Sequence, residues 1–202
     1  MNVGILGGTF DPIHLGHLAA AEAALACAGL ERVLLMPAAQ PPHKDDPHAS
    51  AEDRVAMCRL AVEDRPGLEV SDLELRRPGP SYTVDTLTAF AAERPSDRPF
   101  LILGWDAARE MRTWKQPEHV LELADVVLFS RPTLPTPLEA DLVAAGFQLA
   151  RVTLCTDITP DIRATDVRRL AAAGESLGGL VPPEVERYIR EHHLYGSRGA
   201  TP

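Results

Sequence analysis

Hydrophobic residues fall into short apolar runs, separated by longer stretches in which apolar and polar positions mix at helical spacing. The apolar runs predict strands, with expected ranges 2–6, 31–37, 68–75, 100–103, 126–129 and 148–154. The stretches between them predict helices at 13–28, from 51 onward, and at 84–92, 120–123, 139–145, 165–173 and 184–192. This alternation indicates an α/β fold: a doubly wound, mostly parallel sheet with helices on both faces.

Residues at the expected boundaries support these ranges. Gly29 directly follows the first expected helix, where glycine commonly ends a helix, and Ser50 is placed to cap the second. That second helix has apolar residues spaced for one buried face, at Val55, Leu60 and Ala61. The proline-rich stretch 38–47 breaks regular structure and predicts a loop on the carboxyl side of a strand.

Length and composition limit the number of domains. The chain has 202 residues, 45% of them hydrophobic, which suffices for one substantial core and gives no reason for two. We therefore expect a single domain over residues 1–202, with a small helical part at about 160–195. The apolar stretches are short and broken by charges, and the first residues do not resemble a secretory signal. A soluble, cytoplasmic protein is the expectation.

The net charge of −9 disfavours a broad surface for nucleic acid, because such binding depends on a basic face that releases counterions. A small polyanion remains compatible with this charge, provided that its phosphate site is local. The three cysteines are far apart and show no spacing typical of a zinc site or a redox pair. We expect Cys27, Cys58 and Cys155 to be reduced, small apolar residues.

In doubly wound sheets, ligands bind beyond the carboxyl ends of the strands, where the connections diverge. Three polar segments follow expected strands directly: residues 7–17, 40–44 and 104–106. We expect these segments to lie together at one edge of the sheet and to form the binding site.

The segment 7–17 combines two glycines with two histidines. Gly7 and Gly8 predict a tight turn before a helix, a common way to bind an anion with backbone amides. His14 and His17 are three residues apart, so both imidazoles are expected to point at one phosphate. The sequence is neither the dinucleotide fingerprint nor a P-loop, and a metal site would need a third ligand. The alternative is a pair of surface or half-buried histidines.

Residues 8–17, GTFDPIHLGH, resemble the GxFDPxHxGH signature of the HxGH nucleotidyltransferases, which include pantetheine-phosphate and nicotinate-nucleotide adenylyltransferases. The resemblance implies the Rossmann-like form of the doubly wound sheet. It also implies AMP transfer from ATP without a covalent enzyme intermediate. It implies Mg²⁺ held mainly by the ATP phosphates and no protein metal ligand. The implied ATP-binding residues in this segment are Gly7, Gly8, Thr9, Phe10, His14 and His17.

Three further segments resemble the bacterial nicotinate-nucleotide adenylyltransferases: PPHK at 41–44, SYTVDTL at 81–87 and the closing stretch 181–195. The resemblance implies nicotinate mononucleotide as acceptor, with Trp114 stacked on the pyridine ring. It also implies acceptor contacts from Lys44, from the backbone of Thr83 and from the amide at the position of Glu110.

Residues 162–168, IRATDVR, are similar to the family's late phosphate motif. The similarity implies that Thr165 caps a helix and that Arg168 presents a fork to the β- and γ-phosphates, so Arg168 joins the two histidines as an expected catalytic residue. Arg163 stands where a serine is usual. The alternative is an ordinary capped helix with a solvated arginine.

After the fourth expected strand, Asp106 is expected to bind the ATP ribose or to cap a helix, while Trp105 is larger than the residue usual there. Nicotinamide mononucleotide and phosphopantetheine remain alternative acceptors. The acidic side chain of Glu110, near the expected place of an acidic substrate group, leaves the choice between nicotinate and nicotinamide open. A catalytically silent nucleotide-binding protein is the alternative from another class. The sequence leaves the oligomeric state open, a homodimer included.

Overall fold

The computed structural model describes residues 1–41, 47–130, 136–156 and 160–196. Its centre is one six-stranded sheet in the order β3-β2-β1-β4-β5-β6, and every neighbouring pair is parallel. The strands are β1 (Asn2–Gly8), β2 (Arg32–Pro37), β3 (Leu68–Val70), β4 (Arg98–Gly104), β5 (Asp125–Phe129) and β6 (Val152–Cys155). The chain winds outward from β1 to β3 and returns to β4 on the other side of β1, as a doubly wound sheet requires.

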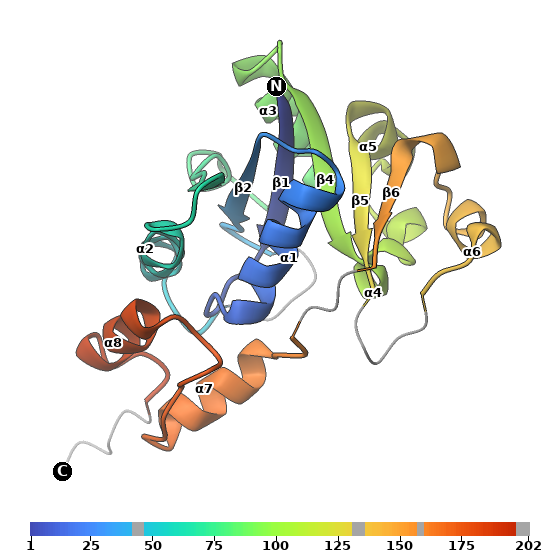
Figure 1. Cartoon of the computed structure of the whole chain (residues 1–202). Helices are drawn as coiled ribbons and strands as arrows, with labels where there is room; N and C mark the ends of the chain where they lie inside the picture. The colour runs from blue at the N-terminus through green and yellow to red at the C-terminus, as the bar shows by residue number, and fades with distance from the viewer. Residues whose placement is uncertain (42–46, 131–135, 157–159, 197–202) are drawn as a thin grey trace.

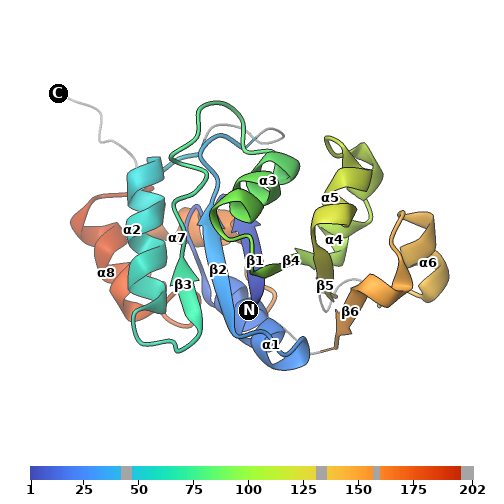
Figure 2. The same ribbon diagram turned by 90° about the horizontal axis from the view of Figure 1, so that it is seen from above.

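Helices cover both faces of the sheet, and α1 and α3 lie on opposite sides of it in Figure 2. One face carries α1 (Leu15–Cys27), α2 (Ala51–Val62), α7 (Ala164–Ala172) and α8 (Pro183–Glu191). The other carries α3 (Thr83–Glu93), α4 (Trp105–Ala108), α5 (Pro117–Leu123) and α6 (Glu139–Ala144). Short 3-10 turns occur at Met111–Thr113 and Leu149–Arg151. The predicted α/β fold class is therefore confirmed.

Each face of the sheet has its own apolar core, because successive strand residues point to opposite faces. Val33 and Leu35 of β2 pack with α1 and α2, whereas Leu34 and Met36 of the same strand pack with α3. Figure 1 shows α7 and α8 beyond the carboxyl ends of the strands, near the start of α1. The C-terminal helices are thus placed beside the edge of the sheet where ligands are expected.

Several predicted boundaries need correction. The strand expected at 68–75 ends at Val70, because the following residues fold into turns. The strand expected at 148–154 begins only at Val152, after a 3-10 turn. The short helix α4 and the turn at Met111–Thr113 follow β4 without having been predicted.

The expectation of three reduced cysteines is wrong for two of them. Cys27 at the end of α1 and Cys155 at the end of β6 form a disulfide across 128 positions of sequence, with their Cα atoms 5.9 Å apart. Cys58 is a buried free thiol, and burial raises its pKa. No helix in the described ranges is both long and apolar enough to cross a membrane.

Candidate active site

The carboxyl ends of the three central strands meet at one edge of the sheet. Gly8 at the end of β1 is in register with Pro37 at the end of β2, and the amide of Ala38 donates to the carbonyl of Gly8 at 2.8 Å. On the other side of β1 lies β4, which ends at Gly104. The polar segments expected to converge therefore leave the sheet side by side, although residues 42–46, including Lys44, lie outside the described part.

The turn after β1 differs from the predicted glycine turn. Gly7 and Gly8 are still in the strand, and the residue with left-handed backbone is Phe10, with φ of 48°. A β-carbon at Gly8 would lie 3.1 Å from the Phe10 ring, a tight approach that glycine avoids. Phe10 is 2% exposed, so its buried ring fixes the turn against the core. The peptide bond between Asp11 and Pro12 is cis.

His14 and His17 lie together at the start of α1. His14 is the residue before the helix and His17 is its third residue; their rings stack with centroids 3.6 Å apart. Phe10 meets the His17 ring edge to face at 4.9 Å. The two imidazoles are neighbours, as expected, and their pointing at one phosphate stays a prediction. Helix α1 begins at Leu15 and not at residue 13, so His14 precedes the helix.

The hydrogen bonds around these histidines assign a donor. The backbone amide of His14 donates to Nδ1 of His17 at 3.3 Å. Because a neutral imidazole has one accepting and one donating nitrogen, Nε2 of His17 carries the proton. The first amide of α1, that of Leu15, donates to the carbonyl of Leu180 at 2.8 Å. The amides of His17 and Leu18 donate to the carbonyl of His14, so these first amides of α1 are engaged inside the protein.

Asp11 connects this turn to three distant segments. Its carboxylate is 5% exposed and accepts from the amides of His48 at 2.8 Å and Ala49 at 3.1 Å, and from the Tyr195 hydroxyl at 2.8 Å. Its carbonyl accepts from Nη1 of Arg168 at 2.7 Å. We call Phe10, Asp11, His14, His17, Arg54 and Arg168 the histidine cluster.

Besides Asp11, Arg54 is a member of this cluster that sequence reasoning did not predict as a site residue. It projects from α2, is 1% exposed, and donates through Nη1 to the carbonyl of Thr9 at 2.7 Å. Burial lowers the pKa of its guanidinium, and the nearby charge of Asp11 opposes that effect. The available signal was its helical spacing from Cys58 and Ala61, which places it on the buried face of α2.

The late motif reaches the cluster through Arg168, while Val167 and Ile162 pack with the core that includes Phe10. Arg168 lies on α7 and its side chain is 20% exposed. The expected cap at Thr165 is wrong: the residue before the helix is Arg163, and Thr165 is exposed in the first turn. The contact that brings this segment near α1 is backbone: a β-carbon at Gly16 would lie 3.0 Å from the Pro160 carbonyl.

The segment after β4 places its two unusual residues differently. Trp105 is 9% exposed and belongs to the core under α3, so its size fills that core. The residue before α4 is Gly104, so the expected cap at Asp106 is also wrong. The Asp106 carboxylate folds back over Gly104 and takes the space that a β-carbon would need there.

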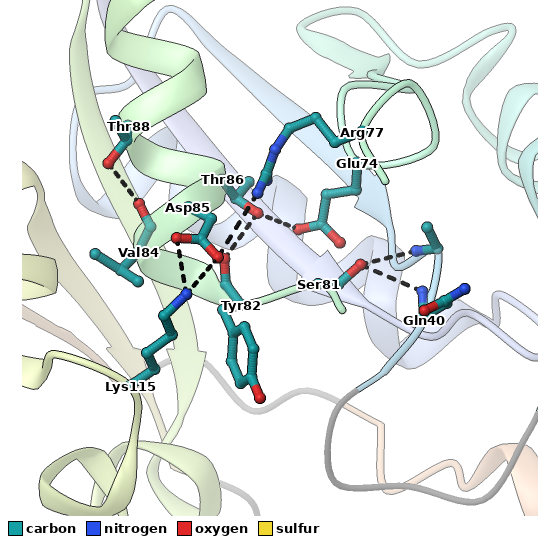
Figure 3. A network of polar contacts seen from close by, with 11 residues as sticks. Gln40, Glu74, Arg77, Ser81, Tyr82, Val84, Asp85, Thr86, Thr88 and Lys115 are labelled. Atoms are coloured by element: carbon teal, nitrogen blue, oxygen red, sulfur yellow. Dashed lines mark hydrogen bonds and ion pairs between the residues drawn. The ribbon is translucent and has the colours of Figure 1, made fainter. Parts of the chain in front are cut away.

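A second group of polar contacts surrounds the start of α3 (Figure 3). The hydroxyl of Ser81 accepts from the amides of Ala39 at 2.9 Å and Gln40 at 3.4 Å. Thr83 is the first residue of α3, directly after Tyr82. These bonds join the start of α3 to the residues that follow β2, beside the histidine cluster.

Lys115 ties the segment of Trp114 to the same helix. Its ammonium lies 2.9 Å from Asp85 Oδ2 and 4.6 Å from the centre of the Tyr82 ring. Trp114 is half-buried against the core under α3. We call Glu74, Ser81, Tyr82, Asp85, Thr86 and Lys115 the α3 cluster. The structure thus brings together the segments that carry Thr83 and Trp114.

Glu110 lies outside the α3 cluster. Its side chain is 58% exposed and faces Arg109. Its backbone amide donates to the carbonyl of Ala107 at 3.2 Å, within the turn after α4. The carboxylate points away from the core, and the amide already has a partner inside its own turn.

Comparison with known proteins agrees with this arrangement. Residues 5–170 match the model of the cytidylyltransferase-like family. The chain belongs to this family. Among its curated relatives, the probable nicotinate-nucleotide adenylyltransferase of Symbiobacterium thermophilum is 49% identical over 196 residues, covering 96% of this chain and 94% of the relative. The protein of that name from Thermus thermophilus is 46% identical over 195 residues, covering 96% of this chain and 100% of the relative.

Solved structures of this cytidylyltransferase-like fold include more distant matches. The nicotinic acid mononucleotide adenylyltransferase of Plasmodium falciparum complexed with NaAD superposes with a TM-score of 0.80 at 17% identity, covering 96% of this chain and 97% of that one. The same enzyme complexed with APC gives 0.78 at 16% identity, covering 96% of each chain. At such identity these matches support the fold.

The cytidylyltransferase-like chain shows no group of three or more histidine, cysteine, aspartate or glutamate side chains arranged for a metal ion within the described ranges. The Asp11 carboxylate already accepts three hydrogen bonds. A magnesium ion that arrives with a nucleotide needs few protein ligands, because phosphate oxygens and water complete its octahedron. The residues present fit an ion carried by phosphates better than one held by a protein cage.

Proposed function

We propose that this chain is a nicotinate-nucleotide adenylyltransferase. It transfers AMP from ATP to nicotinate mononucleotide and forms nicotinate adenine dinucleotide and pyrophosphate. The observation that carries the proposal is the 49% identity, over almost the whole chain, to a relative of that name. The stacked histidines at the sheet edge between β1 and β4 support it.

The chemistry is a single in-line displacement. A phosphate oxygen of the acceptor attacks the α-phosphorus of ATP, the new P–O bond forms, and the bond to the β-phosphate oxygen breaks as pyrophosphate leaves. Such transfers depend on alignment and on stabilisation of spread charge more than on covalent help from the protein. His14 and His17 donate hydrogen bonds to oxygens that gain negative charge, with Nε2 of His17 as one donor.

ATP is bound along the edge from β1 to β4. Gly7 and Gly8 at the end of β1, with Thr9 and Phe10 in the turn after it, shape the phosphate site. Arg168 presents its remaining donors to the β- and γ-phosphates. Asp106 accepts from the ribose hydroxyls, and Thr165 lies in the first turn of the arginine's helix. Mg²⁺ neutralises phosphate charge when it is bound, and it is carried mainly by the nucleotide.

The acceptor binds on the side of the α3 cluster. Trp114 stacks on the pyridine ring, and the start of α3 at Thr83 offers a backbone contact to the nicotinate carboxylate. Lys44 contacts the acceptor phosphate from the segment that follows β2. The exposed carboxylate of Glu110 points away from this side, which keeps an acid away from an acidic substrate, and its amide stays bonded to the carbonyl of Ala107.

The reaction takes place within one domain over residues 1–202, since the same sheet edge carries both halves of the site. We place it in the cytoplasm, where ATP is abundant. The protein acts on small nucleotides and not on nucleic acid, in keeping with its net charge of −9.

The test is pyrophosphate release, measured with a coupled assay in Mg²⁺ and ATP. Three acceptors are compared: nicotinate mononucleotide, nicotinamide mononucleotide and phosphopantetheine. We expect kcat/KM to be highest with nicotinate mononucleotide. Higher turnover with nicotinamide mononucleotide or with phosphopantetheine would correct the assignment of the acceptor. If none of the three acceptors releases pyrophosphate faster than a reaction without acceptor, the proposed enzyme activity is rejected.

A further inference from the structure

The C-terminal tyrosine Tyr195 reaches the histidine cluster from the far end of the chain. Its hydroxyl donates to Oδ1 of Asp11 at 2.8 Å, across 184 positions of sequence. The backbone leading to it has left-handed residues at His193, with φ of 50°, and at Tyr195 itself, with φ of 60°. Such conformations are uncommon outside glycine, and here they aim the phenol at Asp11.

The Asp11 carboxylate accepts hydrogen bonds from neutral donors at both of its oxygens, and Tyr195 binds Oδ1. Besides the Tyr195 hydroxyl, it accepts from the amides of His48 and Ala49. Nδ1 of the His48 ring lies 3.4 Å from Oδ2. Each of these donors uses lone-pair capacity that would otherwise attract a nearby cation.

Arg168 is the cation most exposed to this attraction. Its Nη1 bonds to the main-chain carbonyl of Asp11 at 2.7 Å and lies 3.9 Å from the carboxylate oxygen Oδ2. A small rotation of either side chain would convert this arrangement into a close arginine–carboxylate pair, which is strong and often bidentate. In that pair the fork of Arg168 would face Asp11 and not a phosphate.

We propose that Tyr195 is a positioning residue that holds the Asp11 carboxylate in place through Oδ1 and thereby keeps the fork of Arg168 available for the phosphates of ATP. The role rests on the proposed function, because it gives Arg168 its purpose. Tyr195 touches no substrate in this scheme and acts through Asp11 and Arg168.

The hydroxyl remains a donor over the working range of pH. Burial and the neighbouring charge of Asp11 raise the pKa of Tyr195, so the phenol stays protonated.

A matched control is available in the same helical part. The hydroxyl of Tyr188, on α8, donates to Asp53 Oδ1 on α2 at 2.9 Å. Tyr188→Phe therefore removes the same atom from the same kind of bond, but its carboxylate partner is not in the histidine cluster.

The experiment is a double-mutant cycle with four variants: Tyr195→Phe, Tyr188→Phe, Arg168→Ala, and Arg168→Ala combined with Tyr195→Phe. For each, Kd for ATP in Mg²⁺ is measured by calorimetry, kcat and KM by pyrophosphate release, and folding by thermal melting. We expect Tyr195→Phe to weaken ATP binding about fivefold, as loss of one hydrogen bond implies, and to leave KM for the acceptor within about twofold. Tyr188→Phe should change both quantities less than about twofold.

The cycle separates positioning from a structural role. If Tyr195 acts through Arg168, Tyr195→Phe should raise Kd for ATP by less than about twofold when Arg168 is already alanine. The reason is that the effects of substitutions at coupled residues do not add. An equal loss in both backgrounds, or a Tyr195→Phe variant that matches Tyr188→Phe, would overturn the proposal. If the wild type releases no pyrophosphate with any acceptor, the proposed function fails, while the ATP-binding cycle still decides the role of Tyr195. If the wild type does not bind ATP, both the proposed function and the proposed role of Tyr195 are rejected.

Discussion

Two buried carboxylates, Asp11 and Glu74, hold the two sides of the candidate active site in different ways. Asp11 is 5% exposed and Glu74 is 7% exposed. Asp11 lies among backbone amides, a tyrosine hydroxyl and the guanidinium groups of the histidine cluster. Glu74 accepts from the hydroxyl of Thr86 at 2.7 Å and interacts with that of Ser81. One carboxylate is thus surrounded by fixed backbone donors and cations, the other mainly by neutral hydroxyls.

This difference sets the properties of the two clusters. Burial raises the pKa of Glu74, and its hydroxyl partners and Arg77 only partly oppose that effect. Around Glu74 the charged contacts are exposed pairs, such as Lys115 with Asp85, which contribute little to stability. The histidine cluster is held by buried backbone contacts, while the α3 cluster is held partly by ion pairs at the surface. We therefore expect changes in the first to alter turnover with any acceptor, and changes in the second to alter acceptor affinity.

The largest effect should come from His17→Ala. Loss of a donor to charge that develops in the transition state typically lowers kcat by about 10²- to 10³-fold. We expect that loss with every accepted acceptor, with little change in melting temperature. The assay is pyrophosphate release at saturating substrates. His119→Ala, which removes an exposed imidazole from α5, is the control and should keep wild-type kcat; near-normal turnover of His17→Ala would contradict the catalytic role.

A smaller effect, on the other side of the comparison, is expected for Trp114→Ala. Stacking of an aromatic side chain on a base is typically worth about 1–3 kcal/mol, so KM for nicotinate mononucleotide should rise about tenfold. KM for ATP should stay near its wild-type value. Trp105→Phe should instead lower the melting temperature with both KM values retained, because Trp105 is core. Equal increases in both KM values for Trp114→Ala would remove the distinction between the two clusters.

The smallest effect concerns pH and stability, and it tests Glu74. A carboxyl group whose pKa is higher in the folded than in the unfolded chain binds protons more strongly when folded. Its contribution to the free energy of unfolding is present below the ordinary pKa of 4.5 and is lost as the pH rises through the raised value. We expect urea denaturation from pH 4 to pH 8 to show this decline in the wild type and not in Glu74→Gln.

Glu93→Gln serves as the control for that titration. Glu93 is an exposed carboxylate on α3, paired with Arg76. Its variant should follow the wild-type decline. A Glu74→Gln variant that follows it as well would show that the slope has another origin.

The sequence predicted the sheet well because buried parallel strands have a strong local pattern. Each apolar run became a strand, and the one at 31–37 matches Arg32–Pro37 to within one residue at its start. The closeness of His14 and His17 was also predicted from their spacing, although His14 precedes the helix and its amide bonds to the His17 ring. The strand predicted at 68–75 was too long, because its alternating pattern continues past Val70, where pairing with β2 ends.

The contacts that join distant segments could not be predicted. Nothing local to Asp11 indicates that Tyr195, at the other end of the chain, completes its hydrogen bonding. Arg54 was missed because an arginine inside a helical pattern normally indicates a solvated face. The tight turn was assigned to Gly7 and Gly8, since glycine favours left-handed backbone, whereas Phe10 adopts that conformation with its ring buried.

The disulfide between Cys27 and Cys155 gives the oxidised chain the form of a ring with two tails. The ring holds β2 to β5 and therefore Thr83 and Trp114. One tail carries His14 and His17, and the other carries Arg168 and Tyr195. The histidines and the arginine proposed to act on the ATP phosphates thus lie outside the ring, and the groups proposed to bind the acceptor lie inside it. A single break in the backbone within the ring would leave one covalently joined molecule until the disulfide is reduced.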